Sequence, residues 1–185
     1  SDLEELAKAI TDWPTQYHLG RGRINLLRPF RSLLKGSVLE IGCGCGAITR
    51  ALGEFGADVV ALEGSSLRAE IAATRCRDLG GVTVVCDSFD AFETVERFDV
   101  VTLIGVLEYA RKYFSVEPGN DPVKATLEKA RRMLKPGGVF LLAIENQLGL
   151  KYFGPGDNMV FHAILTGAFL DKHVNQERTK FLFED

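Results

Sequence analysis

The chain has 185 residues, which is the length of one globular domain with a sizeable core. Its apolar fraction of 46% and charged fraction of 25% are typical of a soluble protein, and no apolar run is long enough to span a membrane. The net charge of -3 gives no basic footprint for nucleic acid, and no secretory signal pattern is present. We therefore expect a cytoplasmic domain whose ligand is neither DNA nor RNA.

The four cysteines are Cys43, Cys45, Cys76 and Cys86. Their spacing contains none of the paired or clustered patterns that bind zinc or iron–sulfur clusters, so we expect no metal site. We expect Cys76 and Cys86 to be small buried apolar residues, and Cys43 and Cys45 to fit a tight loop because of their size.

Residues 1–34 are predicted to form a helical cap. The first helix carries apolar side chains at helical spacing, at Leu3, Leu6, Ala7 and Ile10. Pro14 ends this helix, and the apolar pattern of residues 21–30 indicates further helix. Between them, His18 is a candidate base, because histidine is the side chain best placed to exchange protons near neutral pH. Packing of this segment against the core is the alternative.

Residues 38–50 change from a short apolar run to alternating glycines and then to a helical pattern. This order predicts a strand, a tight turn and a helix start. Glycine is needed where the backbone takes positive φ, or where a ligand approaches with no Cβ in its way. The first turn of the helix offers unpaired N–H groups to an electron-rich ligand, so we expect a nucleotide-like molecule here.

Two cofactors fit this loop. Gly42, Gly44 and Ala47 match the relaxed fingerprint of dinucleotide-binding proteins. Glu40 and the alternating glycines Gly42, Gly44 and Gly46 match the E-x-G-x-G-x-G pattern of enzymes that use S-adenosylmethionine (SAM). A carboxylate at Glu40 would repel a pyrophosphate but suits the ammonium group of SAM. The loop alone leaves both cofactors open.

An acidic residue follows the second predicted strand. This strand covers residues 58–62, and Glu63 comes directly after it, about 20 residues beyond the glycines. Glu63 is therefore placed to accept hydrogen bonds from both ribose hydroxyls of an adenosine ligand. Both NAD sites and SAM sites have an acidic residue in this position, so Glu63 does not distinguish the two cofactors. The alternative to ribose binding is that Glu63 is a solvated loop carboxylate.

The next helix is predicted over residues 65–79, with inward-facing side chains at Leu67, Ile71, Ala72 and Cys76. A strand over residues 82–86 follows, and Asp87, Ser88 and Phe89 come after it. The Asp87 carboxylate is placed to meet an adenine amino group, and Phe89 is placed to flank the ring. A simple turn cap at Asp87 is the alternative.

A nearly all-apolar strand is predicted over residues 98–104, as expected of a strand covered on both faces. In open α/β sheets the ligands lie at the carboxyl ends of the strands, so Ile104 and Gly105 should border the reaction site. Glu108 and Tyr109 follow a few residues later.

The remaining pattern predicts a mobile loop over 114–122, a helix over 125–134, a turn over 135–138 and a fifth strand over 139–144, which ends at Glu145. Five strands that alternate with helices predict an α/β fold with a doubly wound, mostly parallel sheet.

We expect one domain over residues 1–185. Its parts are the helical cap, a cofactor-binding core over residues 35–153 and a C-terminal extension over residues 154–185, in which 159–170 has the pattern of an apolar helix.

Taken together, these motifs resemble the class I SAM-dependent methyltransferases, whose fold is Rossmann-like. The motifs stand in the order of that family: the glycine loop, Glu63, Asp87, the strand from Phe98 and the turn at 134–138. The last two are not part of the dehydrogenase pattern, so the resemblance favours SAM over NAD. It implies SAM as cofactor and S-adenosylhomocysteine (SAH) as product. The implied cofactor-binding residues are Glu40, Gly42, Cys43, Gly44, Gly46, Glu63, Gly64, Ser65, Asp87, Ser88, Phe89, Ile104 and Gly105.

A narrower resemblance covers the chain from Trp13 to Phe153. Its stretches, at 17–19, 25–28, 61–65, 103–110 and 143–153, are similar to bacterial methyltransferase domains found with surface-polysaccharide glycosyltransferases. This resemblance implies a sugar or a lipid-linked saccharide as the acceptor, and a fused or partner glycosyltransferase.

The C-terminal extension departs from the class I pattern. That fold continues after its fifth strand with a helix and an antiparallel hairpin, whereas residues 154–185 show little strand pattern. Two explanations stay open: the chain is a fragment of a longer protein, or the sheet is closed differently, by a partner chain such as a second copy.

Methyl transfer mainly requires that the acceptor, the methyl carbon and the sulfur be aligned. For a hydroxyl acceptor, a general base within hydrogen-bond reach would help. His18 is the first candidate base, Glu108 and Glu145 are others, and Tyr109 is expected to shape the site.

The motif Asp/Asn-Pro-Pro-Tyr/Phe of N-methyltransferases does not follow the fourth strand, so we expect methyl transfer to oxygen on a small molecule or saccharide. Two alternatives stay open: a SAM-binding module that regulates or scaffolds a fused glycosyltransferase without turnover, and an NAD-dependent oxidoreductase.

Overall fold

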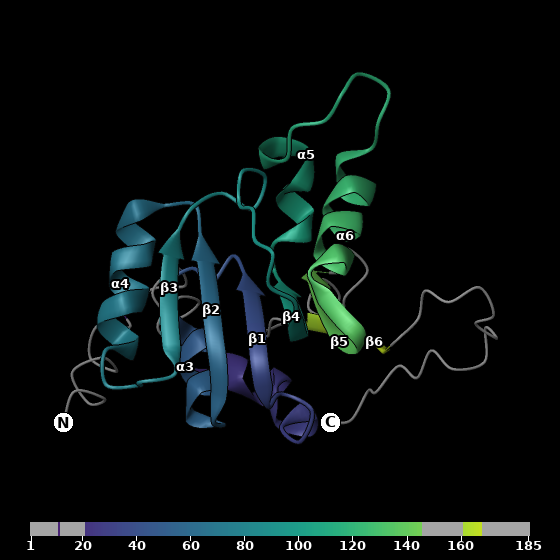
Figure 1. Ribbon diagram of the computed structural model, residues 1–185. Coiled ribbons are helices and arrows are strands. Elements are labelled where there is room, and N and C mark those ends of the chain that lie inside the picture. The colour runs from purple at the N-terminus through teal and green to yellow at the C-terminus, as the bar shows by residue number, and fades with distance from the viewer. Residues whose placement is uncertain (1–10, 12–20, 146–160, 168–185) are drawn as a thin grey trace, which may run out of the picture. The chain divides into compact units, whose positions relative to one another are not determined.

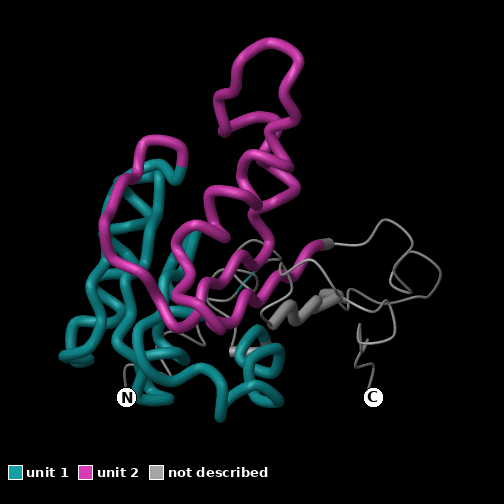
Figure 2. Tube along the Cα trace, turned by 45° about the vertical axis from the view of Figure 1, so that its right-hand side comes forward, with its two compact units in different colours: residues 1–89 teal, residues 90–185 magenta. Residues whose placement is uncertain are grey.

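The computed structural model describes Thr11, residues 21–145 and the backbone of residues 161–167. The chain forms two compact units, Ser1–Phe89 and Asp90–Asp185, which Figure 2 colours separately. The predicted first helix and His18 lie outside the described residues. The division into cap, core and extension therefore stays a prediction.

In the first unit, three parallel strands stand in the order β3-β2-β1. Their carboxyl ends lie at the same edge, as the arrowheads in Figure 1 show. The regular elements of this unit are β1 (Gly36–Ile41), α3 (Ala47–Glu54), β2 (Ala57–Glu63), α4 (Ser66–Cys76) and β3 (Val82–Cys86). These bounds agree with the predicted strands and helices to within a few residues.

Two short 3-10 helices precede β1, η1 (Arg21–Leu26) and η2 (Arg28–Phe30). The sequence predicted further helix here, and the structure forms it as 3-10 turns and not as an α-helix. Pro29 explains part of the difference, because it lacks the N–H that an α-helical bond needs and its ring clashes with the preceding turn. The segment is still anchored in the core, since Leu27 is fully buried and Phe30 is buried.

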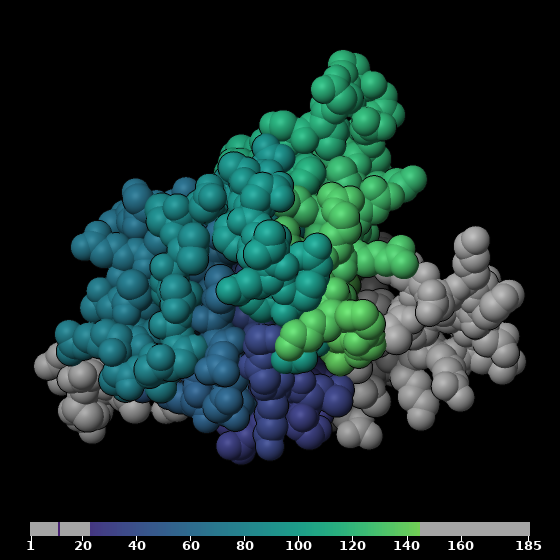
Figure 3. All heavy atoms as spheres, viewed as in Figure 1, coloured from purple at the N-terminus to yellow at the C-terminus, as the bar shows by residue number. Residues whose placement is uncertain are grey.

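In the second unit, β4 (Phe98–Ile104) pairs in parallel with β5 (Leu134–Glu145), and β5 pairs antiparallel with β6 (Phe161–Gly167). Three helices lie between β4 and β5: η3 (Leu107–Tyr109), α5 (Ala110–Tyr113) and α6 (Pro122–Arg132). The segment between α5 and α6 stands out from their ends in Figure 1 and forms a protrusion in the space-filling view of Figure 3. This confirms the predicted loop, although its mobility stays a prediction.

The prediction of an apolar helix over 159–170 is wrong, because residues 161–167 form strand β6. A short apolar run does not distinguish a buried helix from a strand by its period. Here the segment forms a strand because it pairs with β5. The two strands run antiparallel from Glu145↔Phe161 to Val139↔Gly167. The sheet of the second unit therefore does gain an antiparallel strand beyond the parallel ones.

The turn predicted over 135–138 is part of β5, which begins at Leu134. Its residues form an irregularity in the ladder: Leu134 pairs with Phe98, and the next pair is Val139 with Val100. The extra residues on β5 are accommodated as a bulge, and Gly137 takes a φ of 77° there. Helix α6 also begins earlier than predicted, at Pro122, because the Asp121 side chain accepts a hydrogen bond from the Val123 N–H at 3.1 Å.

The predicted inner face of α4 is partly wrong. Ala69, Ala72 and Cys76 are buried, whereas Leu67 is 67% exposed and Ile71 is 38% exposed. Small residues occupy the inner face because the loop before α3 comes very close to α4, as described below. Cys86, predicted to be buried, is exposed on β3, whereas Cys76 is buried as expected. Cys43 and Cys45, predicted to fit the tight loop, are buried as well.

Candidate functional site

The glycine loop, residues 42–46, folds back over the end of β2. The N–H groups of Gly42 and Cys43 both donate to the Leu62 carbonyl, at 2.8 and 2.9 Å. The Gly46 N–H then closes a turn by donating to the Cys43 carbonyl at 3.0 Å. These backbone bonds fix the loop beside Glu63, the last residue of β2. The loop and the acidic residue are therefore one local structure.

The glycines of this loop have different roles. Gly44 has a φ of +56°, and a Cβ added to it would meet nothing within 4 Å. Gly46 has a φ of +75°, and its added Cβ would lie 2.9 Å from the Ala72 Cα on α4. Gly46 thus serves the packing of the loop against α4, while Gly44 leaves an open face that a ligand can approach.

Glu40 lies on β1 with only 3% of its surface exposed. Burial raises the pKa of its carboxyl group to about 7, a shift that the nearby Thr49 side chain and the Arg23 charge partly oppose and the Glu63 charge supports. The Thr49 hydroxyl is close enough to favour the charged form of Glu40, but the geometry between the two side chains is not that of a hydrogen bond. Glu40 Oε2 and Thr49 Oγ1 both lack a hydrogen-bond partner among the described residues. A buried carboxylate oxygen without a donor is costly and calls for a ligand group that donates.

Glu63 is also buried, with 4% of its surface exposed, but its carboxylate is well bonded. Oε2 accepts the Gly44 N–H at 2.9 Å, and Oε1 accepts the Ser65 N–H at 2.9 Å. Arg68, in the first turn of α4, donates to Oε1 from Nε at 3.0 Å and from Nη2 at 2.8 Å. The predicted ribose partner is therefore held in a fixed orientation by the loop and by the start of α4.

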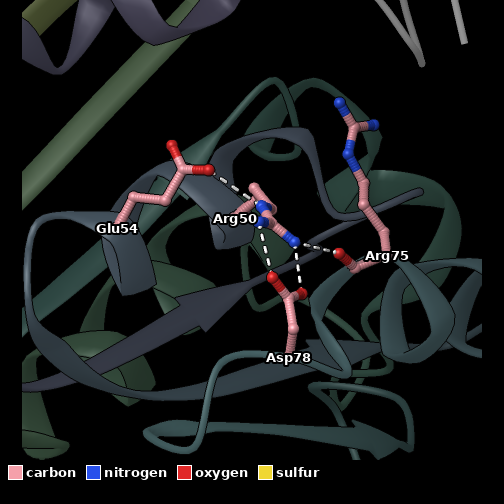
Figure 4. A network of polar contacts seen from close by, with 4 residues as sticks. All are labelled: Arg50, Glu54, Arg75 and Asp78. Atoms are coloured by element: carbon pink, nitrogen blue, oxygen red, sulfur yellow. Dashed lines mark hydrogen bonds and ion pairs between the residues drawn. The ribbon is translucent and has the colours of Figure 1, made fainter. Parts of the chain in front are cut away.

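Arg50 joins the two helices that flank the loop (Figure 4). From α3 it contacts both carboxylate oxygens of Asp78, the Arg75 carbonyl at 2.7 Å and Glu54 at 2.9 Å. The hydrogen bonds from Arg50 lower the pKa of Asp78 below its ordinary value. Arg75 also donates to the Cys45 carbonyl at 3.4 Å. The loop is therefore held by this contact from α4 as well as by its own backbone hydrogen bonds.

At the end of β3, the Asp87 N–H donates to the Glu63 carbonyl at 3.1 Å, which places these two residues side by side. Asp87 Oδ1 accepts the Ser88 N–H at 2.8 Å, so one oxygen of this carboxylate already stabilises a turn. Phe89 is half-buried. A Cβ added to Gly64 would lie 3.9 Å from the Ser88 Cα, which shows that the two loops run close together.

Ile104 and Gly105 are at the carboxyl end of β4 in the second unit. Ile104 is buried, and Gly105 takes a φ of 67° while its N–H donates to the Ala143 carbonyl at 2.8 Å. Glu108 and Tyr109 follow in η3, and both are exposed. The Tyr109 ring lies 6.3 Å from that of Tyr113, measured between centroids. Of Glu145, only the backbone at the end of β5 is described.

The first unit therefore brings most of the predicted cofactor-binding residues together, at the carboxyl ends of β1, β2 and β3. The predicted residues of the second unit share the end of β4. Sequence reasoning missed Thr49, Arg50 and Arg68, which complete the surroundings of the loop. A signal for Arg68 was present, since it is a cation in the first turn of the helix that follows Glu63.

A surface hollow of about 630 Å³ lies elsewhere in the first unit, lined by Ile24, Arg28, Arg31, Glu54 and Phe55. Glu54 and Phe55 are at the end of α3 that is remote from the glycine loop. Part of the hollow is filled by Arg31, whose guanidinium lies 5.0 Å from the Phe55 ring centroid. The hollow is therefore separate from the glycine loop.

Among the residues that the structure describes, no helix has the length and apolar character to cross a membrane. In the same part of the chain, no cluster of three or more histidine, cysteine or acidic side chains is arranged to hold a metal ion.

A family model described as a methyltransferase domain matches residues 39–140. The chain belongs to this family of methyltransferase domains. The match runs from β1, through the glycine loop and Glu63, into β5, so it contains the whole site of the first unit.

Curated relatives include the ubiquinone biosynthesis O-methyltransferase of Chelativorans sp. (strain BNC1), which is 28% identical over 143 residues, covering 74% of this chain and 51% of that protein. The enzyme of the same name from Pseudomonas aeruginosa (strain UCBPP-PA14) is 30% identical over 130 residues, covering 68% of this chain and 51% of that protein. The chain thus spans about half the length of the curated relatives that it matches.

Solved structures share the fold of this methyltransferase domain. A DhpI–SAH complex superposes with a TM-score of 0.58 at 22% identity, covering 78% of this chain and 64% of that chain. The N-methyltransferase NodS from Bradyrhizobium japonicum WM9, in complex with SAH, gives 0.57 at 21% identity, covering 77% and 70%. The predicted fold class is confirmed: an α/β, Rossmann-like fold of the class I methyltransferases.

Proposed function

We propose that this domain binds SAM and transfers its methyl group to a small-molecule acceptor. The observation that carries the proposal is Glu40: a buried carboxylate oxygen that receives no hydrogen bond from the described part of the chain, on the strand that leads into the open face of Gly44. When bound, SAM supplies a methyl carbon on a sulfonium that leaves as a neutral thioether. Membership of the methyltransferase family and the fold shared with SAH-bound enzymes support this cofactor over NAD.

The residues present fit this cofactor. Glu40 Oε2 would accept a hydrogen bond from the ammonium group, and the absence of a side chain at Gly44 would let the ligand contact the backbone. Glu63 would accept hydrogen bonds from the ribose hydroxyls. Asp87 Oδ2 would accept from the adenine amino group, and Phe89 would pack against the ring. The other predicted cofactor residues of the loops, including Cys43, Gly64, Ser65 and Ser88, would shape the backbone around these groups.

We further propose that the acceptor atom is oxygen. The curated relatives are named O-methyltransferases, which supports this choice, while the name of NodS makes nitrogen the competing atom. The saccharide acceptor rests only on the narrower sequence resemblance. Phenolic and saccharide hydroxyls, with amines as the comparison, are therefore the acceptors to test.

For a hydroxyl acceptor, the proposed bases remain His18 and Glu108, with Tyr109 shaping the acceptor side next to Ile104 and Gly105. Glu108 and Tyr109 are exposed at the end of β4, where a proton acceptor could reach an incoming hydroxyl. The test is the pH profile of kcat in each single variant. A general base must be unprotonated to act, so kcat should fall at low pH in the native domain. The variant whose kcat no longer shows this fall identifies the base.

The deciding experiment is calorimetric titration of the domain with SAH and, separately, with NAD. We expect SAH alone to bind, and Glu63→Ala to weaken it by about 10- to 100-fold, which corresponds to the loss of charged hydrogen bonds of about 1.5–3 kcal/mol. Glu70→Ala removes an exposed carboxylate from α4 and is the matched control. Binding of NAD, or of neither ligand, would contradict the proposal.

The alternative is a SAM-binding module that regulates or scaffolds a fused glycosyltransferase without turnover. SAH binding with no methyl transfer to any acceptor class, also in the full-length protein, would favour it.

The glycosyltransferase partner and the homodimer stay predictions, and co-purification and sedimentation of the native protein test them. The cytoplasmic location also stays a prediction.

A further inference from the structure

The carboxylate of Glu63 is crowded on one of its two oxygens. An ionised carboxylate offers about four lone-pair sites, about two on each oxygen. Oε1 accepts three N–H groups, the Ser65 amide with Nε and Nη2 of Arg68, whereas Oε2 accepts only the Gly44 amide. A ribose diol that donates one hydroxyl to each oxygen must therefore displace at least one donor from Oε1.

The two backbone donors cannot leave without unfolding their surroundings. Gly44 is part of the loop that Gly42 and Cys43 tie to the Leu62 carbonyl. Ser65 precedes the first residue of α4, and its carbonyl accepts the Ala69 N–H at 2.9 Å. Moving either amide would break the turn or the first turn of the helix.

The Arg68 side chain can leave. It is 49% exposed, whereas its partner Glu63 is 5% exposed by side chain, so the guanidinium closes the carboxylate from the solvent side. Its stem is flexible, and water can replace its hydrogen bonds when it swings away. An ion pair in which the cation is half exposed is weak and sensitive to salt.

We propose that Arg68 is a displaceable latch on Glu63, which orients the carboxylate in the empty domain and leaves when the ribose hydroxyls of the cofactor bind. This inference rests on the proposed function, because it requires an adenosine cofactor whose ribose meets Glu63. The closed latch lowers the apparent affinity by the fraction of molecules in which it is open. Removal of the latch should therefore tighten binding, which is the opposite of what a cofactor contact would do.

The test is titration of the domain with SAH at about 50 and about 300 mM NaCl, chosen to change the Debye length from above 10 Å to below 8 Å. Arg68→Met keeps much of the stem and removes the donors, and Arg77→Met removes an exposed charge at the end of the same helix as the control. We expect Arg68→Met to bind SAH about two- to fivefold more tightly than the native domain at low salt, as expected for a latch that is closed in most molecules. The difference should shrink at high salt, and Arg77→Met should bind like the native domain.

The possible results separate the two hypotheses. If the native domain does not bind SAH, the proposed function fails, and the latch fails with it. If the native domain binds but Arg68→Met binds equally or more weakly, the cofactor proposal stands and the latch is wrong.

A second measurement needs no variant that might misfold. In ¹⁵N-labelled native domain, the Arg68 Nε–H should exchange slowly with water before SAH is added and rapidly afterwards. An Arg68 Nε–H that stays protected in the complex would overturn the latch. Arg68→Lys, which keeps the charge but not the paired N–H geometry, should give an affinity between those of the native domain and Arg68→Met.

Discussion

The glycine loop with its two carboxylates and the segment at the end of β4 are both predicted to serve the same reaction, yet they are built differently. In the first, Glu40 and Glu63 are 3% and 4% exposed, and backbone bonds fix the loop around them. In the second, Tyr109 is 55% exposed, and Glu108 is exposed as well. Burial and backbone bonding shape the proposed cofactor region before a ligand arrives, whereas the proposed acceptor region presents exposed side chains whose replacement should leave the fold intact.

The largest effect should come from Gly46→Ala. The added methyl group meets the backbone of α4 at Ala72, and φ is +75°, so we expect a loss of about 2–5 kcal/mol in unfolding free energy, from overpacking and left-handed strain together. Urea unfolding measures it.

Gly44→Ala is the matched comparison for that variant. Its φ is also positive, but its Cβ has free space, so we expect a loss of only about 1–2 kcal/mol. SAH binding should nevertheless weaken by about tenfold, because the methyl group takes ligand space. Equal stability losses in the two variants would show that the loop is not packed as described.

The second prediction concerns pH and Glu40. Its pKa is raised from 4.5 to about 7 in the folded domain, so the folded state binds more protons than the unfolded state between these values. The unfolding free energy should therefore fall by about 3 kcal/mol as pH rises from about 4.5 to about 7, and then cease to change from this cause. Glu40→Gln should remove this slope, while Glu70→Gln, on an exposed residue, should keep it.

The same carboxyl group predicts how SAH binding depends on pH. Protons compete with the ammonium group for Glu40, so affinity should drop by up to about tenfold for each pH unit below about 7. An affinity that does not change between about pH 5 and about pH 8 would exclude Glu40 from the proposed ammonium site.

The third prediction tests whether the second unit also contains a fixed polar anchor. Lys129 is 6% exposed and donates to the Asp90 carbonyl at 2.8 Å and to Glu93 Oε1 at 3.0 Å. Lys129→Met should cost about 1–3 kcal/mol of unfolding free energy, because it removes a charged donor. The control is Lys135→Met, whose partner Asp99 is 44% exposed by side chain, and it should cost under about 1 kcal/mol. Equal losses of unfolding free energy in Lys129→Met and Lys135→Met would mean that burial of Lys129 does not strengthen its contribution to stability.

The smallest effect on stability should come from Tyr109→Ala. An exposed side chain of this kind contributes within about 0.5 kcal/mol, so thermal unfolding should be almost unchanged. If Tyr109 shapes the acceptor side, KM for the acceptor should rise while SAH affinity stays constant. A large drop in stability would instead place Tyr109 among the structural residues and would blur the contrast between the two regions.

The parts of the fold that local patterns determine could be predicted from the sequence. The apolar runs gave β3 and β4 with their observed bounds, and the glycine loop and Glu63 were placed correctly at the ends of β1 and β2. These features depend on residues close in the chain, or on the rule that parallel strands end at one edge.

Features that depend on distant partners could not be predicted in the same way. Strand β6 exists because β5 offers it an edge, and α4 turns Leu67 outward because Gly46 brings the loop against Ala72. Glu40 Oε2 receives no hydrogen bond from the residues that the structure describes, and Arg68 contacts Glu63. These two features likewise depend on how the chain folds in three dimensions. Neither periodicity nor spacing contains that information.

The exposure of Cys86 has a practical consequence for chemical labelling. Cys43, Cys45 and Cys76 are buried, and burial raises the pKa of each of these thiols, so reagents that attack the thiolate will react with them slowly. Cys86 is exposed, pairs with Glu63 in the sheet and directly precedes Asp87. A single fluorophore coupled to the native sequence would therefore lie at the edge of the proposed adenosine site and should report its occupancy without any mutation.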